Sequence, residues 1–166
     1  KGRGARYTLA LPGGGEWTLI DESYNANPAS MRAALSLLAQ SATESNARRI
    51  AVLGDMLELG SFSRALHVEL ASALLDAHPD LVLLAGTEMT ALDAALERLV
   101  RHEWHPSVDE LQASLLRHLR PGDVVMMKAS KSIGFAKVVD DLIAQFAPSG
   151  APASGEPAHP SIRQGA

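Results

Sequence analysis

The most constraining feature of this sequence is a regular alternation of short apolar runs with longer amphipathic segments. The apolar runs fall at residues 50–54, 81–85 and 123–128. Runs of this length and composition are typical of strands that are buried on both faces of a parallel sheet. Their alternation with helical segments indicates βαβ units. The sequence therefore predicts an α/β fold, a Rossmann-like and mostly parallel sheet with helices on both faces.

The segments between the runs have the start signals and periodicity of helices. Asn27 followed by Pro28 predicts a helix start, with Asn as the N-cap and Pro at the first helical position. Ser107 and Glu110 form a capping-box pattern at a later helix. The predicted helices begin at residue 28, cover 66–77, 89–99 and 134–146, and include one that opens at 107.

The two ends of the chain differ from this pattern. Residues 7–11 and 17–21 are predicted strands separated by a Pro-Gly-Gly-Gly turn, so the fold should open with a β-hairpin. Residues 147–166 are rich in Pro, Gly, Ala and Ser and cannot bury enough apolar surface to offset their ordering entropy. We expect one domain over residues 1–146 and a disordered tail over 147–166.

Composition excludes several classes of function. A net charge of −4 over 166 residues provides no electrostatic footprint for nucleic acid or an anionic membrane. No apolar run has the length of a transmembrane helix. The absence of cysteine excludes disulfides and thiolate chemistry and fits a reducing compartment. The chain begins without Met, and we expect it to be part of a longer protein.

Three loops that follow predicted strands carry unusual chemistry at the sheet edge where α/β proteins bind ligands. The first, residues 21–28, combines the carboxylates of Asp21 and Glu22 with the carboxamides of Asn25 and Asn27. Carboxylates can bind ribose hydroxyls or a cation, and carboxamides both donate and accept hydrogen bonds. Asn27 by itself is explained by helix capping, but the whole octet indicates a ligand site.

The other two loops carry weaker signals. In residues 54–60, Asp55 follows directly on a strand, although an ordinary glycine-bounded loop explains this spacing equally well. In residues 128–134, Lys128, Ser130 and Lys131 precede a helix and favour an anion, with a basic surface loop as the alternative. His67 is isolated on a helix, and the remaining histidines show no paired metal spacing, so no metal site is predicted.

Several nucleotide and hydrolase motifs are absent. The sequence contains no G-x-x-x-x-G-K-[ST] phosphate loop and no G-x-G-x-x-G after its first buried strand. No Ser-His-Asp or Cys-His arrangement stands out. Phosphate-cradling and nucleophilic chemistry are therefore not predicted within this chain.

The loop motifs resemble those of one known family. The string D-E-S-Y-N-A-N-P at 21–28, followed by Ser30 and Met31, is similar to the opening signature of the C-terminal domain of Mur ligases, in the branch that adds D-alanyl-D-alanine. G-D-M-L-E-L-G at 54–60 with His67 downstream resembles that branch's second block. K-A-S-K at 128–131 resembles its third block, usually K-G-S-R, and Gly2-Arg3 resembles the preceding hinge motif. Lys131 in place of Arg removes the fork that binds anions bidentately.

The resemblance implies a domain of a three-domain, ATP-dependent amide ligase of peptidoglycan precursor synthesis. In that family, ATP activates the carboxylate of UDP-N-acetylmuramoyl-tripeptide as an acyl phosphate, which the amine of D-Ala-D-Ala attacks. ATP and Mg²⁺ are held mainly by the central domain, so this chain is expected to be inactive alone. The resemblance also implies a cytoplasmic monomer that works with the N-terminal and central domains of its own polypeptide and binds neither nucleic acid nor a membrane.

Residue roles follow from the resemblance as hypotheses. Arg3 and one or both of Asp21 and Glu22 would contact the nucleotide. Asn25, Asn27 and Ser130 would face the dipeptide and the peptide stem. Further candidates are Tyr24, Asp55, His67, Lys128 and Lys131.

Three alternative functions remain. The chain could belong to another amide ligase of the superfamily, such as folylpolyglutamate synthase, or act as a non-catalytic nucleotide-binding module. A flavodoxin-like receiver would fit Asp55 and Lys128, but the opening hairpin and the Asn-rich loop disfavour it.

Overall fold

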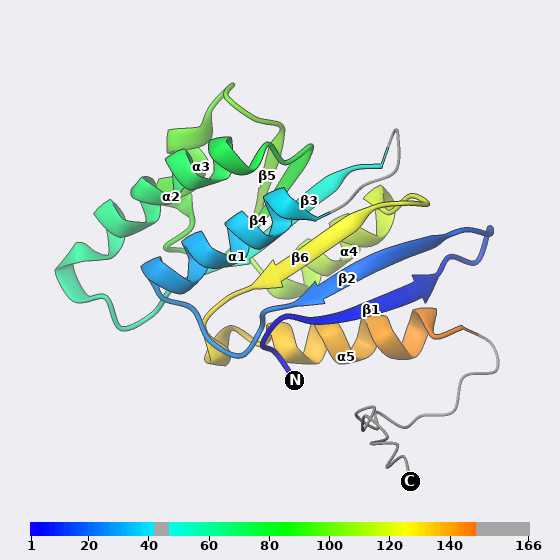
Figure 1. Ribbon diagram of the computed structural model, residues 1–166. Coiled ribbons are helices and arrows are strands. Elements are labelled where there is room, and N and C mark those ends of the chain that lie inside the picture. The colour runs from blue at the N-terminus through cyan, green and yellow to red at the C-terminus, as the bar shows by residue number, and fades with distance from the viewer. Residues whose placement is uncertain (42–46, 149–166) are drawn as a thin grey trace, which may run out of the picture.

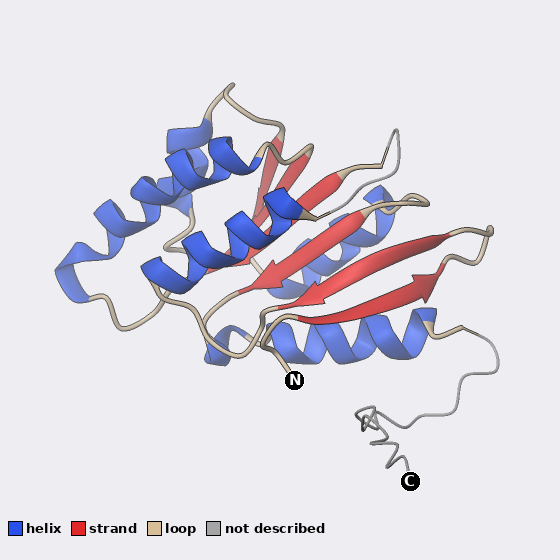
Figure 2. Cartoon of the chain, in the orientation of Figure 1, coloured by secondary structure: helices blue, strands red, loops and turns tan. Residues whose placement is uncertain are grey.

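The computed structural model describes residues 1–41 and 47–148, which form a six-stranded sheet and its covering helices (Figure 1). The strands are β1 (Ala5–Ala10), β2 (Glu16–Asp21), β3 (Arg49–Gly54), β4 (Leu81–Ala85), β5 (His102–His105) and β6 (Val124–Lys128). The α-helices are α1 (Pro28–Gln40), α2 (Ser63–Ala77), α3 (Thr90–Leu96), α4 (Val108–His118) and α5 (Phe135–Phe146) (Figure 2). Two single-turn 3₁₀ helices, η1 (Gly60–Phe62) and η2 (Lys131–Ile133), precede α2 and α5.

The strand order is β1-β2-β6-β3-β4-β5. β1 and β2 form the antiparallel hairpin that the sequence predicts, with Ala5 opposite Asp21. Every other neighbouring pair is parallel, and β6, the last strand in the sequence, lies between β2 and β3. The predicted fold class, a mostly parallel sheet that opens with a hairpin, is confirmed.

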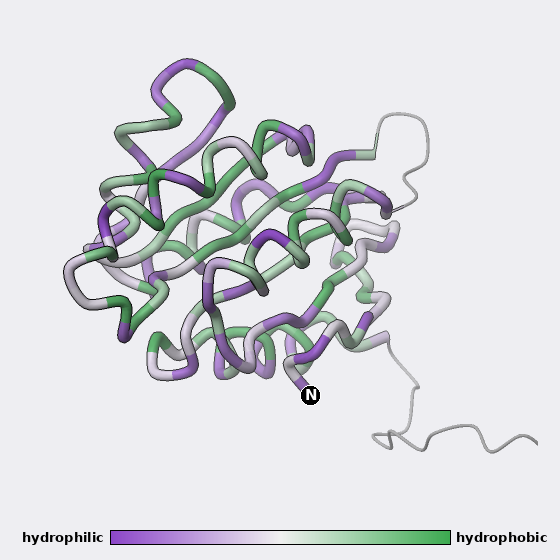
Figure 3. The backbone as a smooth tube through the Cα atoms, turned by 60° about the vertical axis from the view of Figure 1, so that its left-hand side comes forward, coloured by the Kyte–Doolittle hydropathy of each residue, from purple (hydrophilic) through white to green (hydrophobic). Residues whose placement is uncertain are grey.

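Helices cover both faces of the sheet (Figure 1). One core lies between the sheet and α1, α2 and α3, and the other lies between the sheet and α4 and α5. The central strand β3 supplies Ala51 and Leu53 to the first core and Ile50 and Val52 to the second, as the period of a strand requires. The hydrophobic colouring is accordingly concentrated along the strands inside the molecule (Figure 3).

Local signals in the sequence account for two helix starts. Asn27 accepts a hydrogen bond from Ser30 N at 2.8 Å, and the Ser30 hydroxyl accepts one from Asn27 N at 3.0 Å, which completes a capping box. Ser107 accepts from Glu110 N at 3.2 Å at the start of α4. Within the described residues, no helix combines the length and the hydropathy that crossing a bilayer requires.

Some elements differ from the sequence-based prediction. β5 was not predicted, because His-Glu-Trp-His has neither an apolar run nor clean alternation, and this strand lies at the sheet edge. α3 ends at Leu96 rather than at residue 99, because the next residue, Glu97, leaves the helical conformation with a positive φ of 36°. From residue 149 onward, the predicted tail lies outside the described residues.

A buried ion pair lies at the amino ends of β3 and β6, opposite to the strand ends that the loops at 21–28, 54–60 and 128–134 follow. Arg48, just before β3, donates to both carboxylate oxygens of Asp123, at 3.0 and 2.7 Å, and to His118 O at 2.6 Å. Asp123 also accepts from Arg120 N at 2.8 Å and is almost completely buried. The geometry is the bidentate form that stabilises arginine–carboxylate pairs most effectively.

Candidate functional site

The three chemically unusual loops meet at the carboxyl ends of β2, β6 and β3, which are neighbours in the sheet. The helices that follow β2 and β6, α1 and α5, cover opposite faces of the sheet. Loops that diverge to opposite faces leave a crevice at the strand ends, which is where open α/β sheets bind ligands. The topology therefore brings together segments that are more than a hundred residues apart in sequence.

Two cavities lie at this crevice. The larger, of about 740 Å³, is called here the strand-end groove. It is lined by Asn25, Ala26, Asn27, Leu57, Glu58, Leu59, Ser130, Lys131 and Ser132. The smaller, of about 140 Å³, is lined by residues at the N-terminus, after β2 and near the start of α5: Lys1, Gly2, Asp21, Ser23, Tyr24, Lys131 and Ala136. Asn25, Asn27 and Ser130, predicted from separate loops, thus line one groove.

Asp21 anchors the N-terminal segment. One carboxylate oxygen accepts from Gly2 N at 2.8 Å, and the other accepts from Ser23 N at 3.1 Å and Ser23 Oγ at 2.6 Å. Gly2 has a φ of +76°, and a Cβ there would lie 2.8 Å from Tyr24 N, so this approach requires glycine. Both oxygens of Asp21 are committed to the fold, and Asp21 thereby positions the neighbouring Arg3.

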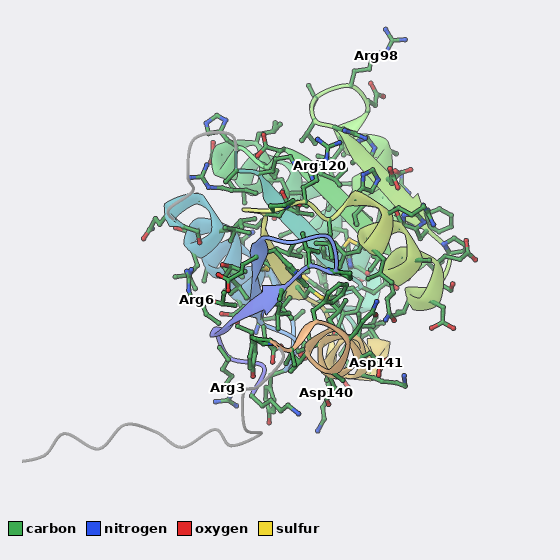
Figure 4. All side chains as sticks on the ribbon, turned by 90° about the vertical axis from the view of Figure 1, so that its right-hand side faces the viewer. Arg3, Arg6, Arg98, Arg120, Asp140 and Asp141 are labelled. Atoms are coloured by element: carbon green, nitrogen blue, oxygen red, sulfur yellow. The ribbon has the colours of Figure 1, made fainter. Side chains whose placement is uncertain are left out.

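Arg3 and Glu22 lie beside this anchor with more freedom. The Arg3 guanidinium stacks over the Tyr24 ring at 4.3 Å from the ring centroid, which is cation–π geometry. Arg3 itself is exposed and extends away from the body of the fold (Figure 4). Glu22 is half-buried, with its carboxylate 3.7 Å from Lys128 Nζ. Of the two acids considered for the nucleotide, Glu22 is the one that keeps hydrogen-bonding capacity.

The loop after β6 ties the other two loops together. Lys128 is buried, and its Nζ donates to Asn25 O at 2.8 Å and Glu22 O at 3.4 Å. Burial lowers the pKa of the Lys128 ammonium, and the nearby Glu22 carboxylate opposes that effect. Ser130 Oγ accepts from Leu57 N at 2.8 Å and lies 3.5 Å from Ala26 O. Lys128 and Ser130 thus fix the positions of the loops that follow β2 and β3 relative to the loop after β6.

The two asparagines leave the same group available for a ligand, the amide nitrogen. Asn27 Oδ1 is used by the α1 cap, and Asn25 Oδ1 accepts from Ala26 N at 2.8 Å. No hydrogen bond within the described residues uses either amide nitrogen. Both side chains are exposed and line the strand-end groove. The groove is therefore supplied with amide donors, which suit a carboxylate or a carbonyl.

Asp55 and His67 act inside the fold. Asp55 accepts from Met89 N at 2.9 Å, and its carboxyl lies where a Cβ on Gly86 would fall. His67 is fully buried; its Nδ1 lies 2.8 Å from Ser63 O, and its Nε2 accepts from Met56 N at 3.1 Å. A carbonyl can only accept, so Nδ1 carries the proton and the ring bridges α2 to the loop after β3. Neither residue lines either of the two cavities.

Asp55 should make stability depend on pH. Burial raises the pKa of its carboxyl, and hydrogen bonds from Met89 N and Glu88 N only partly offset this. Because the folded pKa lies above the unfolded one, the stability from Asp55 is complete below its ordinary pKa and declines as pH rises through the folded value. We expect Asp55→Asn to become progressively more favourable relative to the wild type over the pH range above the ordinary carboxyl pKa of about 4. Urea unfolding of both proteins across this range measures it, and parallel profiles would contradict it.

Sequence reasoning missed the acidic residue of the groove lining. Glu58 lies in the loop after β3 and lines the strand-end groove, although an acidic residue in a polar loop is ordinarily a solvated side chain. Its backbone has φ +62°, in the left-handed region where non-glycine residues are uncommon. No signal in the sequence marks that conformation, because glycine or asparagine is the residue expected there.

Comparison with known proteins identifies the domain. The sequence profile of the family described as "Mur ligase, glutamate ligase domain" matches residues 9–131, which include β2 to β6 and the last two residues of β1. The chain belongs to the Mur ligase family. This confirms the resemblance carried by the three loops, since 21–28, 54–60 and 128–131 all fall within the matched residues.

Several individual Mur ligases are similar to this chain. A protein of Synechocystis named UDP-N-acetylmuramoyl-tripeptide–D-alanyl-D-alanine ligase is 37% identical over 146 residues, covering 87% of this chain and 31% of its own length. A protein of the same name from Mycobacterium tuberculosis is 38% identical over 146 residues, covering 76% of this chain and 29% of its own. The crystal structure of MurF from Acinetobacter baumannii superposes with a TM-score of 0.72 at 27% identity, covering 87% of this chain and 31% of that one. The chain thus spans about a third of the length of these relatives.

Proposed function

We propose that this chain is the C-terminal domain of an ATP-dependent amide ligase that adds D-Ala-D-Ala to UDP-N-acetylmuramoyl-tripeptide in peptidoglycan precursor synthesis. The observation that carries the proposal is the strand-end groove, in which Asn25 and Asn27 present free amide donors beside Ser130. The names of the Synechocystis and Mycobacterium tuberculosis relatives state this activity for those proteins. A peptide substrate needs such donors for its carbonyl and carboxylate oxygens.

The nucleotide would approach from the N-terminal side of the site. Arg3 is exposed and positioned through Gly2 and Asp21, so it can contact ATP phosphates, while Glu22 can accept from the ribose. Within the described residues, no group of three or more His, Asp or Glu side chains is arranged to hold a metal ion. We assign Mg²⁺ and the main phosphate contacts to the central domain of the same polypeptide, as the family resemblance implies.

In the proposed reaction, the terminal carboxylate of the tripeptide is phosphorylated by ATP, and the amine of D-Ala-D-Ala displaces phosphate from the acyl phosphate. An acyl phosphate hydrolyses in water, so the site should be complete only when the domains close. The contribution of this chain is to bind the dipeptide and orient its amine. We place the enzyme in the cytoplasm and expect it to act as a monomer.

The assignment is tested by phosphate release in the full-length enzyme, supplied with ATP, Mg²⁺ and UDP-N-acetylmuramoyl-tripeptide, with and without D-Ala-D-Ala. We expect release to require the dipeptide and the preceding domains, and this chain alone to be inactive. Activity with a different amino acid would retain the family and reject this substrate. Turnover by the 166-residue chain alone would overturn the division between domains.

Asn25→Ala in the full-length enzyme is expected to raise the KM for D-Ala-D-Ala about tenfold, the equivalent of one hydrogen bond to a charged ligand. Asn27→Ala should act similarly but also removes the cap of α1, which costs about 1 kcal/mol. Asn27→Ser separates the two effects, since it keeps a capping oxygen and loses the amide donor. Steady-state kinetics measure the effect; unchanged KM and kcat in Asn25→Ala and Asn27→Ser would reject the assignment of both residues to the dipeptide.

A further inference from the structure

The strand-end groove has two chemically different sides. Its lining loops leave three neighbouring strands, in the order β2, β6 and β3. Asn25 and Asn27 come from the loop after β2, and Glu58 comes from the loop after β3. Lys131 comes from the loop between them, after β6. Glu58 and the two asparagines therefore face the groove from opposite sides.

Glu58 and Lys131 are the ionisable side chains of this lining. Both are exposed, and neither takes part in an ion pair in the described part of the chain. Lys131 Nζ lies 5.8 Å from the centroid of the Tyr24 ring, so its charge is directed toward the β2 side of the site. The groove thus has a positive side at Lys131 and the asparagines and a negative side at Glu58.

The backbone on each side of the groove has a feature that bears on this arrangement of charges. α1 (Pro28–Gln40) begins on the positive side, directly after its cap Asn27, and the positive end of its helix dipole favours an anion there. On the negative side, Glu58 is held at φ +62°. A non-glycine residue in that region costs conformational energy that surrounding structure must offset. This cost is consistent with retention of the carboxylate for a purpose other than the fold.

A free dipeptide is a zwitterion with an ammonium at one end and a carboxylate at the other. We propose that the groove binds its dipeptide in a single orientation, with the ammonium end at Glu58 and the carboxylate end at Lys131 and Asn27. Glu58 and Lys131 are then specificity-determining residues that favour dipeptides carrying both charges over analogues that lack one. The inference rests on the proposed function, because it assigns an orientation to the substrate of that same site.

The test pairs each variant of the full-length enzyme with a probe that lacks one charged end. N-propionyl-D-alanine is D-Ala-D-Ala without its amine and is used as a competitive inhibitor. D-Ala-D-Ala amide lacks the carboxylate and is used as a substrate. Glu58→Gln should raise the KM for D-Ala-D-Ala about tenfold and leave inhibition by N-propionyl-D-alanine unchanged. Lys131→Met should raise the KM for D-Ala-D-Ala similarly and leave the KM for the amide unchanged.

Exposed residues of like charge outside the groove provide matched controls. Glu69→Gln on α2 and Lys137→Met on α5 should leave all these constants at wild-type values. The orientation is overturned if Glu58→Gln weakens N-propionyl-D-alanine, if Lys131→Met raises the KM for the amide, or if neither variant changes the KM for D-Ala-D-Ala. A wild-type enzyme that does not use D-Ala-D-Ala rejects the proposed function instead. The same variants are then tested with the amino acid it accepts and the amide of that amino acid.

Discussion

Asp123→Ala is expected to lower the free energy of unfolding by about 3–5 kcal/mol, the usual cost of removing one partner of a buried ion pair. Asp123 is 1% exposed and accepts hydrogen bonds from Arg48 Nε, Arg48 Nη2 and Arg120 N. The substitution leaves the partly buried Arg48 guanidinium without its carboxylate and Arg120 N without its acceptor. Urea unfolding of the chain measures the loss.

The matched control is Asp140→Ala on α5. Asp140 lies 2.7 Å from Lys1 Nζ, the same N–O distance as between Arg48 and Asp123, but both members of the Lys1–Asp140 pair are exposed. Exposed pairs contribute little to stability, because solvent screens the charges and the side chains lose entropy. Asp140 lies on the outer surface of α5 (Figure 4). Equal losses in the two variants would show that burial does not determine the strength of the Arg48–Asp123 pair.

The central strands and the site loops were predictable because their signals are local. A strand buried on both faces must be apolar throughout, and the run at 81–85 corresponds residue for residue to β4. Strands of a parallel sheet end at one edge, so the loops at 21–28, 54–60 and 128–134 had to lie on the same side. The sequence could not show that β6 inserts between β2 and β3, because the pairing partner of a buried apolar strand has no local signal.

The sequence also could not predict the hydrogen-bond partner of each polar side chain. Asp21 and Lys128 read as ligand-contacting residues from type and position, yet both make their hydrogen bonds to neighbouring loops. A carboxylate or ammonium at a strand end serves either a ligand or the loop geometry, and only the three-dimensional structure identifies its partners. Glu58 is the opposite case, a residue that sequence type and position do not mark as a ligand contact but that lines the groove. Its backbone there has a positive φ, which glutamate does not favour.

His67→Ala is expected to lower the free energy of unfolding by about 2–4 kcal/mol, from the cavity left by a fully buried ring and the loss of an acceptor for Met56 N. His67→Gln should restore part of this loss, because its amide oxygen can accept from Met56 N. Glu69→Ala, an exposed change on the same helix, should remain within about 0.5 kcal/mol of the wild type. Urea unfolding of the three variants measures these differences.

The kinetic effect of His67→Ala tests whether His67 positions the loop of the groove without itself contacting the substrate. The bond from Met56 N to His67 fixes the loop that carries Glu58 two residues later, so its loss should disorder one wall of the strand-end groove. In the full-length enzyme, we expect a higher KM for D-Ala-D-Ala with little change in the KM for ATP, whose proposed contacts, Arg3 and Glu22, lie beside β2. Partial recovery of the dipeptide KM in His67→Gln would follow from restored loop geometry. A His67→Ala enzyme with wild-type KM for D-Ala-D-Ala would show that the loop after β3 holds its shape without the histidine.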